Sequence, residues 1–199
     1  MIFYSDAPKF KEVHPFPFAD ECSPLKKYLW FNFSSAETQL SASGPIPVSK
    51  QKFTPEKGYG WVKSYDLKII TTSLKSQVYT SFATSGRPAT FRMKCPLGYY
   101  YLTMTFGNCN QSCGPFNVKV NDEIKLKEIK LDKGRFSTEL ILVKADKGII
   151  DVKLEGVNGN NWILNGMALQ PVMTMNEDFI FTRPWWHYEN LNMLNKKLY

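Results

Sequence analysis

Apolar and polar residues alternate with a period of two over much of the chain from residue 61 to residue 169. The clearest case is residues 99–106, YYYLTMTF, which place Tyr100, Leu102, Met104 and Phe106 on one face of an extended strand. The opposite face is amphipathic, and we expect it to be in contact with water, as one face of an antiparallel sheet commonly is.

Other short segments have the same strand pattern, and turn residues separate them at intervals of roughly 8–12 residues. These segments are residues 28–33, 77–82, 90–94, 116–120, 137–143, 149–154 and 162–169. Residues 145–148, Ala-Asp-Lys-Gly, predict a hairpin between the strands on either side, and residues 34–56 are expected to be mostly loop. No stretch between the strands has the 3.6-residue period of a crossover helix. The pattern therefore predicts an all-β fold, an antiparallel β-sandwich or jelly roll.

The two ends of the chain differ from this pattern. Residues 1–27 contain four prolines among aromatic residues, which favours an extended lead-in. Residues 173–199 predict an aromatic linker followed by a short C-terminal helix, with Pro184 in its first turn and a stripe of leucines on one side. The predicted organisation is thus a lead-in over residues 1–27, a sandwich over residues 28–172, and a linker and helix over residues 173–199.

Composition narrows the choice of partner. The 199 residues carry a net charge of +7, but the lysines are scattered, and the densest cluster, within residues 125–133, alternates with apolar residues as on the wet side of a strand. A nucleic-acid groove would gather positive charge with exposed aromatic residues, so we do not expect nucleic-acid binding. No apolar run is long enough for a membrane span. The amino terminus also lacks the apolar run of a signal peptide, so the chain is either cytosolic or a mature or excised piece.

The four cysteines do not predict a metal site. Cys109 and Cys113 lie in one loop, where a disulfide between them is possible in an oxidising compartment. Their spacing is not that of a zinc knuckle, and the only two histidines lie at opposite ends of the chain. We expect Cys22 and Cys95 to be free buried thiols.

Several motifs occur in an order that resembles a known family. They are Trp30-Phe31-Asn32-Phe33, Gly58-Tyr59-Gly60-Trp61, Pro96-Leu97-Gly98-Tyr99-Tyr100, Thr103-Met104-Thr105-Phe106-Gly107-Asn108 and Trp162-Ile163-Leu164-Asn165-Gly166. This order resembles the galactose-binding-like β-sandwich domains attached to rhamnogalacturonan lyases, rhamnogalacturonan acetylesterases and related glycan-degrading enzymes. The resemblance covers about residues 28–172 and implies a jelly-roll module of a secreted or periplasmic carbohydrate enzyme. The chain departs from the family at Ser34, where a glycine is usual, and at Asn108, where an acid is common.

No catalytic constellation is evident in the sequence. Neither serine-rich stretch forms a nucleophile elbow with a histidine base, and the Gly-Asp-Ser motif of the acetylesterase catalytic domain is absent. The acids fall mainly in turns, where solvated acids are common. Tyr59 and Arg87 could be imagined as a lyase pair, but nothing in their spacing requires it. We therefore expect a protein without catalytic activity, metal or cofactor.

Carbohydrate binding remains open, because sugars are held by aromatic rings together with polar side chains on loops. The candidate ligand-binding residues are Tyr59, Trp61, Arg87, Asn108, Asn110, Asn161 and Trp162. For Trp61 and Trp162 burial in the core is the favoured interpretation, since large aromatic residues at strand starts usually pack. The stretch KGYGW at residues 57–61 then begins a strand, in a place where a sugar could be met.

The leading hypothesis is a non-catalytic module of a polysaccharide-degrading enzyme that binds carbohydrate, a pectic or other plant or host glycan, or braces an adjacent catalytic domain. One alternative is the N-terminal portion of a longer glycoside hydrolase or polysaccharide lyase, with residues 179–186 as the junction. Another is a standalone adhesion or assembly domain.

Overall fold

A computed structural model describes residues 29–35, 45–72 and 79–172 of the chain. The predicted lead-in and C-terminal helix lie outside these residues, as do Cys22 and both histidines. The described part contains thirteen strands and one 3-10 turn, at Val157–Gly159. None of its segments is a helix with the length and apolar character needed to cross a membrane.

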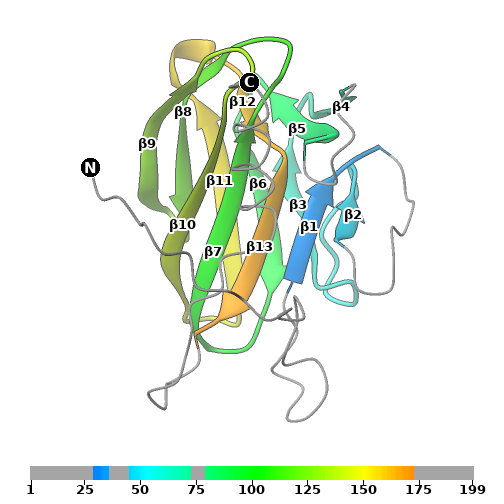
Figure 1. Cartoon of the computed structure of the whole chain (residues 1–199). Coiled ribbons are helices and arrows are strands. Elements are labelled where there is room, and N and C mark those ends of the chain that lie inside the picture. The colour runs from blue at the N-terminus through cyan, green and yellow to red at the C-terminus, as the bar shows by residue number, and fades with distance from the viewer. Residues whose placement is uncertain (1–28, 36–44, 73–78, 173–199) are drawn as a thin grey trace, which may run out of the picture. The chain divides into compact units, whose positions relative to one another are not determined.

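Two five-stranded sheets form most of the fold (Figure 1). The first sheet has the order β10-β7-β13-β1-β2, and the second has the order β3-β6-β11-β8-β9. The first comprises β10 (Phe136–Ala145), β7 (Gly98–Gly107), β13 (Gly166–Pro171), β1 (Leu29–Phe33) and β2 (Ile46–Val48). The second comprises β3 (Tyr59–Ser64), β6 (Ala89–Lys94), β11 (Ile149–Gly156), β8 (Cys113–Val120) and β9 (Glu123–Leu131). All strand pairs in these two sheets are antiparallel except β1 with β2.

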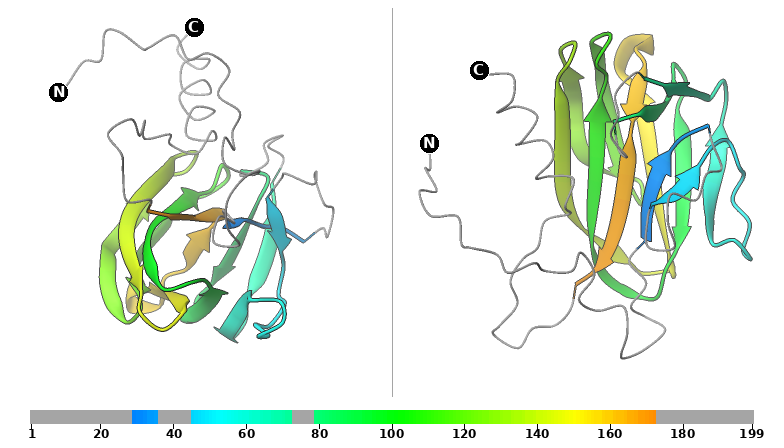
Figure 2. Two further views of the ribbon diagram at one scale, coloured as in Figure 1. Left: turned by 90° about the horizontal axis from the view of Figure 1, so that it is seen from below. Right: turned by 45° about the vertical axis from the view of Figure 1, so that its right-hand side comes forward.

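A third, small sheet has the order β12-β5-β4. Its strands are β12 (Trp162–Leu164), β5 (Ser81–Ser85) and β4 (Lys68–Thr71). The two large sheets lie face to face, as the turned views show (Figure 2). This arrangement confirms the predicted all-β antiparallel sandwich.

Aromatic side chains from both sheets fill the space between them. Phe31 and Phe33 of β1 meet Phe91 of β6, with ring centroids 5.3 and 5.4 Å apart in edge-to-face contacts. Trp61 of β3 lies 5.2 Å from Phe91, again edge to face. The predicted inward face of β7 is confirmed, because Tyr100, Leu102, Met104 and Phe106 are all buried in this core. Burial on this scale is the main stabilising contribution to a sandwich.

Two predictions about strand pairing and length were wrong. Residues 145–148 do not close a hairpin, because β10 pairs with β7 in the first sheet, whereas β11 pairs with β6 and β8 in the second. The described residues of segment 34–56 are mostly loop, as expected, and they contribute only the three-residue strand β2 at the edge of the first sheet, where Pro47 is tolerated because an edge strand leaves half of its backbone groups unpaired. The predicted strand 162–169 is two strands, interrupted at Asn165.

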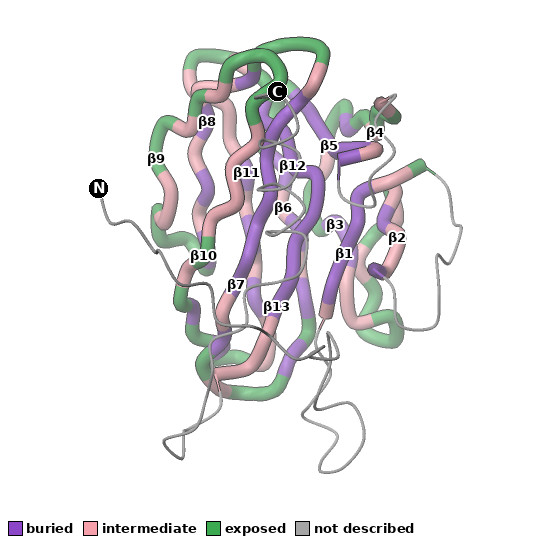
Figure 3. Tube along the Cα trace, in the orientation of Figure 1, coloured by how far each residue is buried: buried purple, intermediate pink, exposed green. Residues whose placement is uncertain are grey.

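The expected water-facing side of β7 was also partly wrong (Figure 3). Tyr99 is 52% exposed, but Thr103 and Thr105 are 4% and 0% exposed although they lie on the face opposite the core residues. Thr105 Oγ1 lies 3.1 Å from Thr138 Oγ1, so its hydroxyl has a partner. Alternation identifies which residues share a face, but it does not say whether another segment covers that face.

The stretch at residues 57–61 is the start of β3, as expected. Gly58 has φ +76° and Gly60 has φ +145°, both in a region that side-chain-bearing residues rarely adopt. A Cβ on Gly60 would lie 2.5 Å from the backbone nitrogen of Phe53. That nitrogen donates to the carbonyl of Trp61 at 3.0 Å, so the second glycine is needed for two backbone segments to pair closely.

Candidate functional site

The sequence-predicted site residues do not form one site. Arg87 lies between β5 and β6, and Asn161 directly precedes β12, so both belong to the end of the sandwich where β11 finishes. Arg87 Nε is 3.1 Å from Asp66 Oδ2, and both side chains are about two-thirds exposed. A surface ion pair of this kind contributes little to stability. Asn161 and the nearby Tyr65 are exposed as well.

The two candidate tryptophans are core residues. Trp61 is 1% exposed and Trp162 is 0% exposed, and their ring centroids are 6.0 Å apart. Trp61 Nε1 donates to the carbonyl of Ser49 at 2.9 Å, and Trp162 Nε1 donates to the carbonyl of Arg87 at 2.7 Å. A sugar cannot reach either ring without unpacking the sandwich, so neither tryptophan belongs to the candidate site.

The remaining predicted residues have separate local roles. Asn108 is 4% exposed, and its Oδ1 accepts from the backbone nitrogen of the exposed Asn110 at 2.9 Å, which forms an Asx turn. Tyr59 begins β3, at the opposite end of the β3–β6 pair from Arg87. Its ring packs on Phe31 with centroids 5.0 Å apart, and burial raises the pKa of its phenol. The imagined pairing of Tyr59 with Arg87 is therefore not present in the structure.

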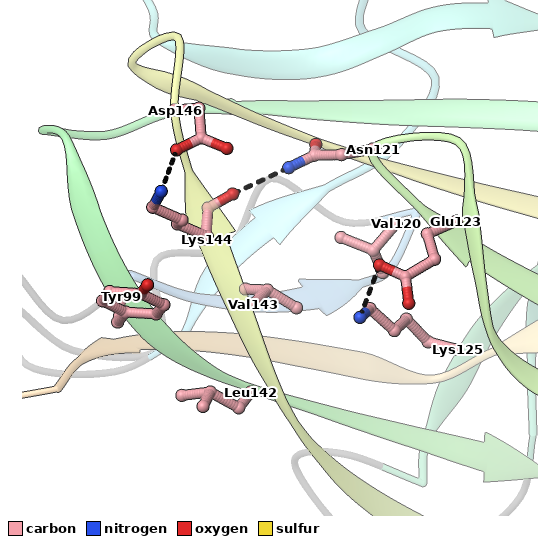
Figure 4. A pocket seen from close by; sticks show the side chains of 9 residues that line it. All are labelled: Tyr99, Val120, Asn121, Glu123, Lys125, Leu142, Val143, Lys144 and Asp146. Atoms are coloured by element: carbon pink, nitrogen blue, oxygen red, sulfur yellow. Dashed lines mark hydrogen bonds and ion pairs between the residues drawn. The ribbon is translucent and has the colours of Figure 1, made fainter.

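A concave site lies at the other end of the sandwich, where β7 begins and β8 and β10 finish. It is a hollow of about 310 Å³, and such a volume is at the lower end of the range for small-molecule sites. Figure 4 shows the side chains that line this hollow. They are Tyr99, Val120, Asn121, Glu123, Lys125, Leu142, Val143, Lys144 and Asp146.

The hollow combines apolar and polar groups. Val120 and Val143 are 2% and 3% exposed and belong to the core, whereas Tyr99 and Leu142 are each 52% exposed. Two exposed apolar side chains therefore lie beside charged groups, so the hollow offers both apolar contact and hydrogen bonds.

The turn between β8 and β9 shapes one wall of the hollow. Asn121 and Asp122 have φ 49° and 67°, the left-handed pair of a type I′ hairpin, which Asn and Asp tolerate well. The Asn121 side chain donates from Nδ2 to the carbonyl of Lys144 at 2.9 Å and accepts at Oδ1 from the nitrogen of Asp151 at 3.0 Å. One amide thus ties the end of β10 to β11 and holds the wall in place.

The charged groups of the hollow are already paired. Lys144 Nζ is 2.8 Å from Asp146 Oδ1, and Lys125 Nζ is 2.7 Å from Glu123 Oε2. The hydrogen bond to Asp146 raises the pKa of Lys144, so this side chain is an ammonium at neutral pH. The same ammonium lies 5.7 Å from the ring centroid of Tyr99, within range of a cation–π contact.

Sequence reasoning missed these residues for a simple reason. Tyr99 was assigned to a wet strand face and Asp146 to a turn, and nothing local connects them. The connection comes from the pairing of β7 with β10, which sets Tyr99 opposite Lys144. Without that register, the sequence signal for this site is an aromatic residue, Tyr99, near the start of a strand.

The thiols and acids do not assemble a metal centre in the described part of the chain. No group of three or more His, Cys, Asp or Glu residues able to hold an ion occurs there. Cys109 and Cys113 are separate thiols, and burial raises the pKa of Cys113 to about 11. Cys95 is buried and free, as expected.

Comparisons with known proteins bear on the fold. No family model matches the sequence, and no curated protein matches it. Among solved structures, a Bacillus subtilis protein superposes with a TM-score of 0.56 at 19% identity over 73% of this chain and 40% of its own. The β-glucuronidase of Bacteroides uniformis gives 0.56 at 18% identity, over 74% of this chain and 18% of its own. The extracellular domain of ANXUR2 from Arabidopsis thaliana gives 0.55 at 12%, over 73% and 41%.

These likenesses show a shared β-rich fold. The chain spans less than half the length of each of these three structures. The matched regions come from proteins as different as a glycoside hydrolase and a plant extracellular domain, and one fold commonly hosts many functions. The function must therefore be argued from the site.

Proposed function

We propose that this chain is a non-catalytic carbohydrate-binding module of a secreted or periplasmic polysaccharide-degrading enzyme, and that it holds a glycan in the hollow lined by Tyr99, Leu142 and Lys144. The observation that carries the proposal is the half-exposed Tyr99 ring beside Leu142, with ammonium and carboxylate groups within the same hollow. The occurrence of the fold within a β-glucuronidase supports a place in glycan chemistry. The narrower expectation, a rhamnogalacturonan-degrading partner, rests on the order of sequence motifs.

A sugar in this hollow would be held by apolar contacts and by hydrogen bonds. The C–H face of a pyranose would cover the exposed parts of Tyr99 and Leu142, while its hydroxyls would donate to Asp146 and accept from Lys144. Full burial of a large apolar side chain is worth about 1.5–3 kcal/mol. Tyr99 is already about half buried, so we expect its ring to contribute about 0.8–1.5 kcal/mol, or about four- to tenfold in affinity.

The test is calorimetric titration of the chain with a panel of neutral and acidic cell-wall oligosaccharides. Calorimetry does not depend on the three tryptophans of the described residues, Trp30, Trp61 and Trp162, which are each at most 4% exposed. We expect Tyr99→Ala to weaken binding about four- to tenfold. Tyr65→Ala is the matched control, since Tyr65 is 62% exposed at the other end of the sandwich and should leave affinity unchanged.

Two results would contradict the proposal. One is the absence of binding to every member of the panel. The other is binding that Tyr65→Ala weakens and Tyr99→Ala leaves alone, which would place the ligand on the Arg87 end of the sandwich.

A further inference from the structure

The charges in the hollow restrict which glycan it can hold. The lining contains two separate ion pairs, Lys125 with Glu123 on β9 and Lys144 with Asp146 at the end of β10, so it is neutral as a whole. Each ammonium lies within 2.8 Å of its own carboxylate. The site therefore has no free positive charge to offer, although the chain carries a net charge of +7.

We propose that the hollow selects uncharged, hydroxyl-rich glycans and discriminates against glycans that carry carboxylates. This inference rests on the proposed function and names the class of ligand for the same site. It differs from the expectation that net charge alone would give, which is a preference for acidic polymers.

A sugar that carries a carboxylate meets the carboxylates of Glu123 and Asp146 as it approaches the hollow. In both pairs the carboxylate is the more exposed member: Glu123 is 69% exposed against 26% for Lys125, and Asp146 is 64% exposed against 53% for Lys144. A ligand carboxylate that approached Lys125 would be repelled by the more exposed Glu123 and would have to displace it. Like-charge contacts of this kind are a common source of discrimination between ligands.

A neutral sugar uses the same groups without displacing either pair. A hydroxyl can donate to Asp146 while a neighbouring hydroxyl accepts from Lys144, because each carboxylate oxygen and each ammonium can make more than one hydrogen bond. Hydrogen bonds to charged groups are stronger than those between neutral groups. Vicinal hydroxyls on one ring therefore match the Lys144–Asp146 pair in donor and acceptor character.

Non-specific attraction has to be separated from binding in the hollow. Lys127 and Lys130 are exposed on β9, at the edge of the second sheet, and would attract any polyanion. Attraction between exposed charges is screened at high salt, where the Debye length falls to about 3 Å at 1 M. Contacts between a neutral sugar and the hollow do not depend on such attraction, so high salt should leave them in place.

The experiment compares two oligosaccharides of equal length and linkage, one of galactose and one of galacturonic acid, by calorimetry at low and at high salt. At high salt we expect the neutral ligand to bind at least about tenfold more tightly, which corresponds to about 1.4 kcal/mol. Asp146→Asn leaves the Lys144 ammonium without its carboxylate, and we expect it to shift the preference toward the acidic ligand about tenfold. Asp132→Asn makes the same change of charge in an exposed turn at the other end of β9 and should not shift the preference.

The outcomes separate this inference from the function on which it rests. Equal or tighter binding of the acidic ligand at high salt, lost in Lys144→Gln, would overturn the neutral-glycan inference and leave a carbohydrate-binding site. A preference that Asp146→Asn and Asp132→Asn change equally would also overturn it. Failure of both ligands, and of every other glycan in the panel, would overturn the proposed function as well.

Discussion

Replacement of Trp61 by alanine distinguishes a core residue from a ligand-binding residue. Trp61 is 1% exposed, and its ring contacts Phe33, Phe91 and Trp162 at centroid distances of 5.6, 5.2 and 6.0 Å. Its Nε1 also donates to the carbonyl of Ser49 at 2.9 Å. Removal of the ring leaves a cavity between the two sheets and takes the donor from that carbonyl.

The expected loss follows from these contacts. Truncation of a buried tryptophan to alanine costs about 3–5 kcal/mol, a large part of the roughly 5–15 kcal/mol that stabilises a typical domain. For a chain of this size the midpoint of thermal unfolding should fall by about 6–20 °C. Trp61→Phe retains most of the packing and loses the hydrogen bond with Ser49, so it should cost about 1–3 kcal/mol.

The assay is urea unfolding followed by circular dichroism, together with glycan calorimetry at a temperature where each variant is still folded. We expect Trp61→Ala to lose stability, Trp61→Phe to lose less, and both to bind glycan as the unchanged chain does. The reasoning fails if Trp61→Ala abolishes binding while the midpoint of unfolding stays where it was. That result would mean that the ring faces a ligand rather than the core.

Three further predictions concern the backbone, the wall of the hollow and pH. Gly60→Ala should destabilise the fold by at least about 2 kcal/mol, because the new Cβ meets the backbone of Phe53 and the left-handed φ adds strain; a variant as stable as the parent in urea would contradict this. Asn121→Ala should lower the free energy of unfolding by about 1–3 kcal/mol and weaken glycan binding. Asn121→Gly retains the positive φ of the turn and should lose only the side-chain hydrogen bonds. Equal unfolding midpoints for the two variants would contradict the role of the turn. Burial raises the pKa of Cys95 from 9.0 to about 11 and that of Tyr100 from 10.0 to about 12, so the folded state favours both neutral groups. The contribution of the two neutral groups to stability is complete below about pH 9 and is lost as pH rises through 11 to 12. The urea midpoint should therefore decline across that range, and Cys95→Ala should make the decline smaller.

On the outer face of the second sheet a lowered pKa, that of Glu155, makes stability depend on pH in the acid range. Hydrogen bonds from Lys119, and less from Lys153, lower the pKa of Glu155 below its ordinary value of 4.5. The stabilisation is present above that value and is lost as pH falls through the lower folded-state pKa. Glu155→Gln should therefore flatten the acid limb of the stability curve, and an unchanged acid limb would show that this carboxylate makes no net contribution.

Parts of the fold could be predicted because they depend on local backbone geometry. The two-residue period of β7 identified four core residues that the structure buries. The glycines before Trp61 indicated a strand start, and the close approach of Phe53 to Gly60 explains why. In each case a residue's own side chain or torsion preference is sufficient to predict the outcome.

The candidate site could not be predicted in the same way. Loop position and polarity selected Arg87 and Asn161, which lie at the end of the sandwich away from the hollow. Tyr99 and Lys144 are 45 positions apart in the chain and meet only because β7 pairs with β10. The hairpin predicted at residues 145–148 would have paired β10 with β11, and Tyr99 would then not lie opposite Lys144.

By itself the sequence determined that the described part of residues 28–172 forms mainly strands, and which side chains of β7 point into the core. Strand faces follow from the alternation of side chains along an extended backbone, which is a property of neighbouring residues. Only the tertiary structure decided which strands pair, which outward faces are nevertheless buried, and that Tyr99, Leu142, Lys144 and Asp146 share one hollow. Those outcomes depend on how strands that are far apart in the chain pack against each other. The energy of that packing is distributed over the whole sandwich, so no single segment of the sequence specifies it.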